Sequence, residues 1–191
     1  VVADVLERYD VDGVHLDDYF YPYPSEETPF PDAAGYERFV GAGGEADLKA
    51  WRRTHINSFV KELSKMVRRH SPSARIGISP FGIWRPGNPE GVVGFDAYDG
   101  LAADAKLWVQ AGWLDYVSPQ LYWPIESPGQ PFEPLLNWWR HTDTRERGVW
   151  PGLCLTRIKA DGGWAPDAIE RQILASRQQK AGGFILFSMV G

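Results

Sequence analysis

Short apolar segments alternate with longer amphipathic segments along most of the chain. Side chains of a strand point alternately to two faces, whereas the apolar positions of a helix recur every three to four residues. By these patterns the sequence predicts strands at 10–19, 74–82, 115–123, 149–158 and 184–189. It predicts helices at 1–9, 47–70, 101–111, 132–147 and 166–180, and a long loop rich in proline and glycine at 20–46.

This alternation predicts an α/β fold with parallel strands and with helices on the outside. An open doubly wound sheet and a (β/α)8 barrel of the TIM type both have this pattern. No G-x-G-x-x-G or G-x-x-x-x-G-K-[ST] run follows a predicted strand, which removes the phosphate-binding reason to prefer the open sheet. Polar and aromatic residues gather instead where the strands end, as in barrels.

A whole barrel needs about 250 residues, and this chain has 191. We therefore interpret residues 1–191 as a single, partial TIM-barrel domain that contains five of eight strand–helix units. In this interpretation the first three strands are missing. Any catalytic or binding group on those strands would be missing as well.

Composition narrows the possible partners. The net charge is −5 without a basic run, so we do not expect binding to nucleic acid. No apolar run reaches the roughly 20 residues of a membrane span. The single cysteine, Cys154, excludes an internal disulfide framework and a cysteine-based zinc site. The chain is rich in aromatic residues, with 9 Trp, 8 Tyr and 9 Phe, which suits stacking against sugar rings as well as core packing.

The strand predicted at 10–19 carries the candidate chemistry. Val14 and Leu16 share one face, and His15 and Asp17 share the opposite face. Asp18 follows where the chain turns into the long loop. Two adjacent acids at the end of a barrel strand predict a catalytic site there.

Four runs of sequence carry a resemblance to a known family: D-V-D-G-V-H-L-D-D-Y-F-Y-P-Y (10–23), W-R-R-T-H-I-N (51–57), G-I-S-P-F-G-I-W-R-P (77–86) and A-D-A-K-L-W-V-Q-A-G-W-L-D-Y-V-S-P-Q-L-Y-W (103–123). In this order they resemble the bacterial glycosyl hydrolase-like 10 family over nearly the whole chain. The resemblance implies a (β/α)8 barrel in which the five predicted strands are the fourth to the eighth. It also implies an extracytoplasmic glycosidase that cleaves an envelope polysaccharide, namely peptidoglycan glycan strands stripped of their peptides.

Cleavage of a glycosidic bond usually needs two carboxyl groups on either side of the bond. Asp17 is the first candidate and Asp18 the second, and Glu126 is the best partner elsewhere in the sequence. The alternatives are structural: Asp17 as a buried acid paired with Arg52 or Arg53, and Asp18 as a cap of the loop. We expect no metal or other cofactor, because one histidine and two aspartates in one segment make a weak set of ligands.

The candidate substrate-binding residues lie near predicted strand ends, or, for Arg53, at the start of the predicted helix 47–70 on the same face: His15, Tyr19, Arg53, Trp84, Gln120, Tyr122 and Trp123. Gln120 and Tyr122 share a face with Ser118 and should point into the barrel. For His15, hydrogen bonding inside the barrel is an equal alternative. Gln120 and Tyr122 could instead fill the barrel, and Arg53 could pair with an acid rather than with a carboxylated sugar.

Three hypotheses about function remain at this point. The chain is part of a glycoside hydrolase, a carbohydrate-binding module without turnover, or an inactive barrel fragment. A fragment with uncovered sheet edges is also expected to associate with itself.

Overall fold

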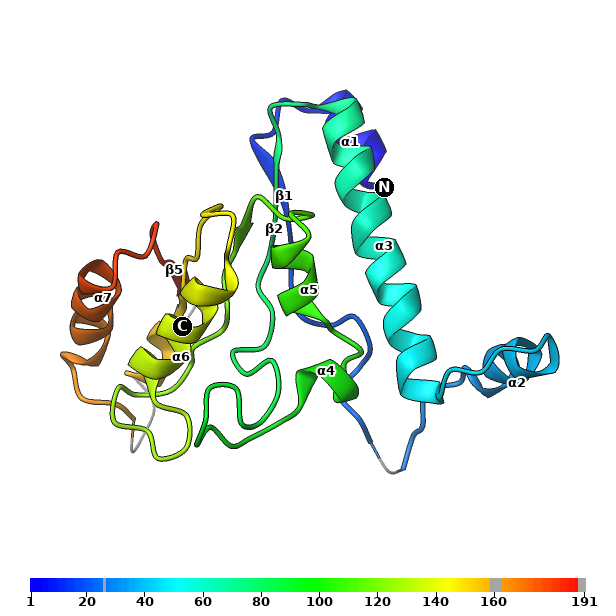
Figure 1. Cartoon of the computed structure of the whole chain (residues 1–191). Coiled ribbons are helices and arrows are strands. Elements are labelled where there is room, and N and C mark those ends of the chain that lie inside the picture. The colour runs from blue at the N-terminus through cyan, green and yellow to red at the C-terminus, as the bar shows by residue number, and fades with distance from the viewer. Residues whose placement is uncertain (26, 159–162, 189–191) are drawn as a thin grey trace.

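The computed structural model describes residues 1–25, 27–158 and 163–188 (Figure 1). The helices are α1 (Val2–Arg8), α2 (Ala33–Gly41), α3 (Leu48–His70), α4 (Ala97–Gly100), α5 (Ala105–Gln110), α6 (Phe132–Thr142) and α7 (Ala168–Gln178), with the 3-10 helix η1 (Leu155–Arg157). The strands are β1 (Gly13–Leu16), β2 (Arg75–Ile78), β3 (Tyr116–Val117), β4 (Gly152–Cys154) and β5 (Ile185–Phe187).

The strands run parallel, as predicted, and lie side by side in chain order. His15 of β1 pairs with Gly77 of β2, β2 pairs with β3, and β4 pairs with β5. Two single bridges, Val117 to Val149 and Gln120 to Gly152, join β3 to β4. The described strands thus form one continuous row without the reversal of strand order that marks a doubly wound sheet. This order favours the barrel interpretation.

The hydrophobic core lies between the strands and the helices. Ile76 and Ile78 of β2 and Val60 of α3 are fully buried in it. Two tryptophans from neighbouring helices are also fully buried and have partners for their ring N–H groups. Trp108 Nε1 donates to Asn57 Oδ1 at 2.7 Å, and Trp139 Nε1 donates to the Gly82 carbonyl oxygen at 2.8 Å.

The opposite face of the strands, called here the inner face, carries a row of stacked rings. The His15 and Tyr116 rings stack with centroids 5.5 Å apart, and those of Tyr116 and Trp150 stack at 4.2 Å. Gly77 makes this row possible, because a Cβ atom there would lie 2.1 Å from Tyr116 Cζ. The absent side chain lets a ring from β3 cross β2 and reach β1.

Two local predictions were wrong. The segment predicted as loop at 20–46 contains α2, and the strand predicted at 149–158 ends at Cys154 and continues as η1. Helix α2 forms because Tyr36 and Phe39 pack on Trp51, with ring centroids 5.6 and 6.3 Å away. The predicted strand at 184–189 extends to residue 189, which lies outside the described residues.

No helix in the described ranges combines the length and apolar character that a membrane span requires.

The outer side of β1 leads to a prediction about association. β1 pairs with β2 on one side, and its last residue Leu16 lines a pocket of about 470 Å³ together with Phe20, Ile56 and Phe59, among others. Phe59 is 50% exposed. Because an open strand edge beside exposed apolar side chains favours pairing with another chain, we expect the 191-residue chain to associate with increasing concentration. Multi-angle light scattering checks this, and a constant mass of 21.5 kDa would contradict it.

Candidate active site

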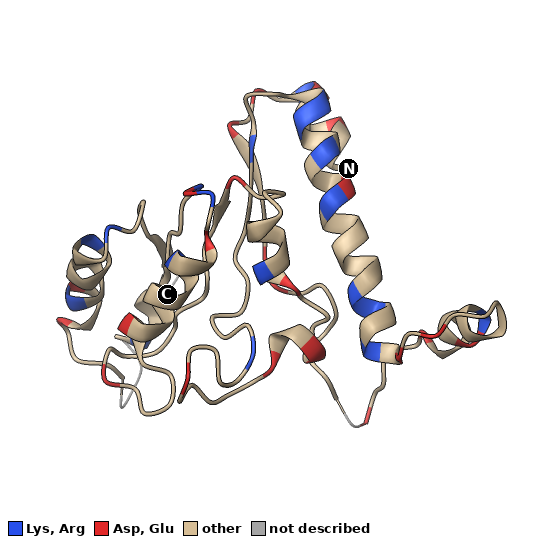
Figure 2. Ribbon diagram, in the orientation of Figure 1, with Lys and Arg blue, Asp and Glu red and all other residues tan. Residues whose placement is uncertain are grey.

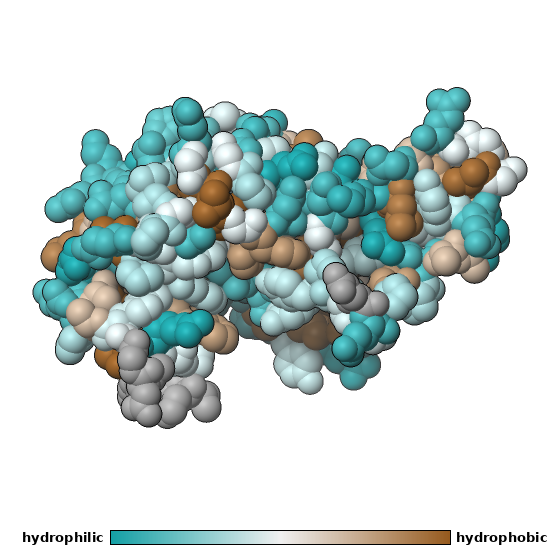
Figure 3. All heavy atoms as spheres, turned by 90° about the horizontal axis from the view of Figure 1, so that it is seen from below, coloured by the Kyte–Doolittle hydropathy of each residue, from teal (hydrophilic) through white to brown (hydrophobic). Residues whose placement is uncertain are grey.

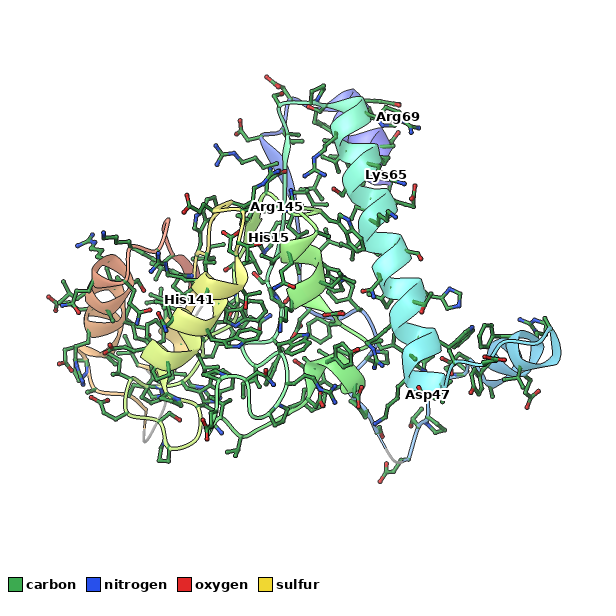
Figure 4. The ribbon with its side chains drawn as sticks, viewed as in Figure 1. His15, Asp47, Lys65, Arg69, His141 and Arg145 are labelled. Atoms are coloured by element: carbon green, nitrogen blue, oxygen red, sulfur yellow. The ribbon has the colours of Figure 1, made fainter. Side chains whose placement is uncertain are left out.

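The strands end at the side of the molecule where α3 begins, marked by Asp47 in Figure 4. Figure 3 views this side, on which hydrophobic patches lie between polar regions. The acidic pair Asp17 and Asp18 follows β1 directly. Asp17 is exposed, whereas Asp18 is 2% exposed. Adjacent carboxyl groups therefore have different environments.

Asp17 is oriented by donors from two segments. Gln120 Nε2 donates to Asp17 Oδ1 at 2.8 Å and to the Ser79 carbonyl oxygen at 3.0 Å. The Asp18 backbone N–H donates to the same Asp17 oxygen at 2.9 Å. The Gln120 amide therefore ties the carboxyl group of Asp17 to the end of β2, across the strand ends.

Asp18 is held by the long loop. The Tyr23 hydroxyl donates to Asp18 Oδ2 at 2.6 Å. Burial raises the pKa of Asp18, the hydrogen bond from Tyr23 lowers it, and the charge of Asp17 raises it again, so that the pKa lies above its usual value. Burial, as the largest cause, thus favours the protonated form of Asp18.

His15 lies on the inner face in the middle of the molecule (Figure 4). Its Nδ1 is hydrogen bonded to the Tyr116 hydroxyl at 2.8 Å and its Nε2 to the Ser79 hydroxyl at 2.7 Å. Burial lowers the pKa of His15, while the nearby charge of Asp17 raises it in part, so that the neutral imidazole is favoured. Its described partners match the alternative of a histidine satisfied inside the barrel.

Aromatic rings surround the acidic pair. Phe81 meets Trp123 edge to face with centroids 5.6 Å apart, and Tyr19, 70% exposed, lies 5.8 Å from Tyr23. Tyr122 stacks on Phe187 at 5.6 Å, and its pKa is raised by burial and by neighbouring charges that include Asp17 and Asp18. Rings from the loop after β1 and from the segments that follow β2 and β3 thus lie around the acids.

The arginines expected as structural partners of Asp17 pair with other acids. Arg52 donates to both oxygens of Asp32, at 2.7 and 2.8 Å. Arg53 pairs with Asp99 at 2.6 Å, and its guanidinium lies 3.9 Å from the centre of the Tyr98 ring. Figure 2 shows this acidic α4 segment beside the basic first turns of α3.

Two further predicted residues have partners away from the acidic pair. Glu126 is exposed and forms an ion pair with Arg171 of α7, which holds the pKa of Glu126 below its usual value. Trp84 donates to Asp104 at 3.1 Å and stacks on Trp138 at 5.8 Å. Seven of the predicted residues lie together near the strand ends: Asp17, Asp18, His15, Tyr19, Gln120, Tyr122 and Trp123. The other three have partners elsewhere, namely Asp99 for Arg53, Asp104 for Trp84 and Arg171 for Glu126.

The sequence placed Ser79 at a strand end and offered Tyr23 as a ring that could stack on a sugar, but it gave neither residue its hydrogen-bond partner. Tyr116 was not among the predicted residues. Alternation could have found it, because Tyr116 shares the inward face of its predicted strand with Ser118 and Gln120.

In the described ranges, no group of three or more His, Cys, Asp or Glu side chains is arranged to hold a metal ion.

Replacing Asp18 by asparagine is expected to stabilise the fold at neutral pH. The pKa of Asp18 is higher in the folded than in the unfolded state. Asp18 therefore stabilises the fold at pH values below its unfolded pKa, and this stabilisation is lost as the pH rises through the folded pKa. Where the pH exceeds the folded-state pKa of Asp18, the ionised and buried carboxylate costs free energy, which asparagine avoids. We expect the free energy of unfolding to rise by about 1 kcal/mol at pH 7 and the gain to vanish below about pH 4. Urea denaturation at both pH values measures this, and a loss of stability at pH 7 would contradict it.

Comparison with known proteins identifies sequence relatives and a similar fold. The sequence model of the family "Glycosyl hydrolase-like 10" matches residues 1–164. The chain is 36% identical over 186 residues to "Glycosyl hydrolase YngK" of Bacillus subtilis (strain 168), which covers 93% of this chain and 36% of that protein. It is 38% identical over 174 residues to "Glycosyl hydrolase DigH" of Escherichia coli (strain K12), covering 87% of this chain and 38% of that protein. The chain thus spans little more than a third of the length of these relatives.

A solved structure has the same fold. The glycoside hydrolase domain of PgaB (BpsB) from Bordetella bronchiseptica superposes with a TM-score of 0.63, over 97% of this chain and 54% of that chain. The sequence identity is 13%, so this likeness concerns the fold alone.

Proposed function

Because the chain belongs to the glycosyl hydrolase-like 10 family, we propose that it forms the fourth to eighth strands of the barrel of a glycoside hydrolase. The order of the parallel strands and the likeness to the PgaB glycoside hydrolase domain support this placement. Strands from elsewhere in the full-length protein would close the barrel beside β1 and β5.

The acidic pair carries the proposal. Asp17 is exposed at the strand ends, and its described hydrogen-bond donors are the amide of Gln120 and the backbone of Asp18 rather than an arginine. A carboxyl group held in this way is oriented but not neutralised. Asp17 is therefore our candidate for the essential carboxylate that contacts the sugar.

The two acids differ in the way glycoside cleavage requires. The transition state resembles an oxocarbenium ion, so that one carboxyl group must give a proton to the leaving oxygen while negative charge stabilises the sugar. The raised pKa of Asp18 suits a proton carrier, and the exposed carboxyl group of Asp17 is our candidate for the group that faces the sugar. Glu126 remains our proposed partner across the bond, and it would have to leave Arg171 to reach the sugar.

We further propose that the substrate is a bacterial envelope polysaccharide, namely peptidoglycan glycan strands freed of peptides, and that the protein acts outside the cytoplasm. The four matching sequence runs support this choice. Tyr19, Tyr122 and Trp123 offer rings against which successive sugars can stack.

The test is cleavage of peptide-free glycan strands by the full-length protein, measured as new reducing ends, with the 191-residue chain assayed in parallel. Turnover by the full-length protein supports the proposal. Binding seen by calorimetry without new reducing ends would favour a carbohydrate-binding module instead. Activity of the full-length protein alone would identify the 191-residue chain as an inactive fragment.

A further inference from the structure

The loop that follows β1 returns to the acidic pair, where the Tyr23 hydroxyl contacts Asp18 Oδ2. We propose that Tyr23 is a positioning residue, whose hydroxyl fixes the carboxyl group of Asp18 and keeps it ready to release its proton. This inference rests on the proposed function, because it assigns a role to Tyr23 within the same site. Tyr23 acts through Asp18 and is not itself a catalytic residue.

The first support is the geometry of the contact. The Tyr23 hydroxyl lies 2.6 Å from Asp18 Oδ2, the distance usual for a charge-assisted hydrogen bond from a hydroxyl to a carboxylate. The Tyr23 ring is fixed by contacts with Phe95 at 5.3 Å and with Phe81 at 6.5 Å. Because the ring is held from the side of β2, the hydroxyl has a defined direction toward Asp18.

The second support is the anchoring of the loop on both sides of Tyr23. Before it, the Phe20 backbone N–H donates to the Asp18 carbonyl oxygen at 2.8 Å. After it, Asp32 accepts hydrogen bonds from Arg52 of α3 and, at 3.2 Å, from the Tyr21 hydroxyl. These contacts tie the loop to the first turns of α3, so that Tyr23 is held in place independently of any bound sugar.

The third support comes from the charges around Asp18. Asp17 faces it from the same segment, Tyr23 from the loop, and Tyr122 from the segment that follows β3. Burial and Asp17 both favour the protonated form, whereas the Tyr23 hydroxyl stabilises the ionised form. Without this hydroxyl, Asp18 would hold its proton more tightly and would be a weaker acid toward the leaving oxygen.

Tyr23→Phe tests the proposal, because it removes the hydroxyl and keeps the ring contacts. Tyr21→Phe is the matched control: it removes a hydroxyl–carboxylate hydrogen bond from the same loop, but Arg52 still holds Asp32. In the full-length protein we expect Tyr23→Phe to move the basic limb of the pH–kcat profile upward by about one pH unit. We expect kcat below that limb to fall about tenfold, with KM changed less than about twofold.

A Tyr23→Phe profile that superposes on the wild type, an increase in KM alone, or an equal shift in Tyr21→Phe would each overturn the proposal. Titration of 13C-labelled aspartate carboxyl groups by NMR gives a readout without turnover, and Asp18→Asn identifies the Asp18 signal. The pKa of Asp18 is expected to rise in Tyr23→Phe and to stay unchanged in Tyr21→Phe. If the wild type cleaves no glycan but this rise is seen, the proposed function fails while the positioning by Tyr23 stands. If the wild type cleaves glycan but the pKa of Asp18 is unchanged in Tyr23→Phe, the proposed function stands and the positioning role of Tyr23 is wrong.

Discussion

Replacing Asp17 by asparagine is expected to lower the rate of glycan-strand cleavage by roughly a thousandfold in the full-length protein, the size of effect typical for loss of a group that acts on the reacting bond. The side-chain oxygen of the introduced asparagine can still accept the hydrogen bonds from Gln120 and from the Asp18 backbone. The substitution therefore removes the negative charge at the strand end and leaves the local geometry in place. Release of reducing ends from peptide-free strands, followed over time, measures the loss.

Asp10→Asn is a suitable control, because it makes the same charge change at an exposed aspartate before β1. This variant should retain the wild-type rate. In both variants the free energy of unfolding should stay within about 1 kcal/mol of the wild-type value, as is usual for surface substitutions. If Asp17→Asn cleaves glycan at the wild-type rate, Asp17 is not the essential carboxylate and the proposed mechanism is wrong.

The largest effect on stability is expected from Gly77→Ala. The three atoms nearest to a Cβ at this position all belong to the Tyr116 ring, at 2.1 to 2.5 Å. The ring would have to leave its place over β2, which breaks its stacking on Trp150 and its hydrogen bond to His15. Overpacking of this kind costs about 1–3 kcal/mol, and we expect a value near the upper end. Chemical denaturation measures the change in the free energy of unfolding.

Gly41→Ala provides the comparison, because no atom lies within 4 Å of the added carbon at this position in α2. It should change stability by less than about 1 kcal/mol, in the stabilising direction. The cost of Gly77→Ala should also shrink in a Tyr116→Ala background, where no ring lies over the glycine. A cost that is the same in both backgrounds would show that the Tyr116 ring is not its cause.

The sequence predicted the α/β pattern and the inward direction of His15 and Asp17, because alternation along a strand is a local property. It placed Gln120 at the same strand ends for the same reason. The parallel order of the strands also followed from the alternation with helices. These features depend on the spacing of residues that are close in sequence.

The partners of the charged residues could not be predicted in this way. Arg52 was a candidate partner of Asp17 but pairs with Asp32, and Arg53 pairs with Asp99. These pairings depend on where the loop with Asp32 and the short helix α4 with Asp99 lie relative to α3. The spacing of residues along the sequence does not contain this information. The same holds for Tyr23, whose direction is set by contacts with Phe81 and Phe95 from a different unit of the fold.

The neighbour-by-neighbour order of the strands has a consequence for biosynthesis. Each unit leaves the ribosome after the unit on which it docks, so the sheet can grow by adding one strand at a time to an edge that is already present. Pairing of this kind joins units that are successive in the chain and keeps the cost of loop closure low. In a complete ring, only the last seam would join strands distant in sequence, and that step would be the slow and error-prone one.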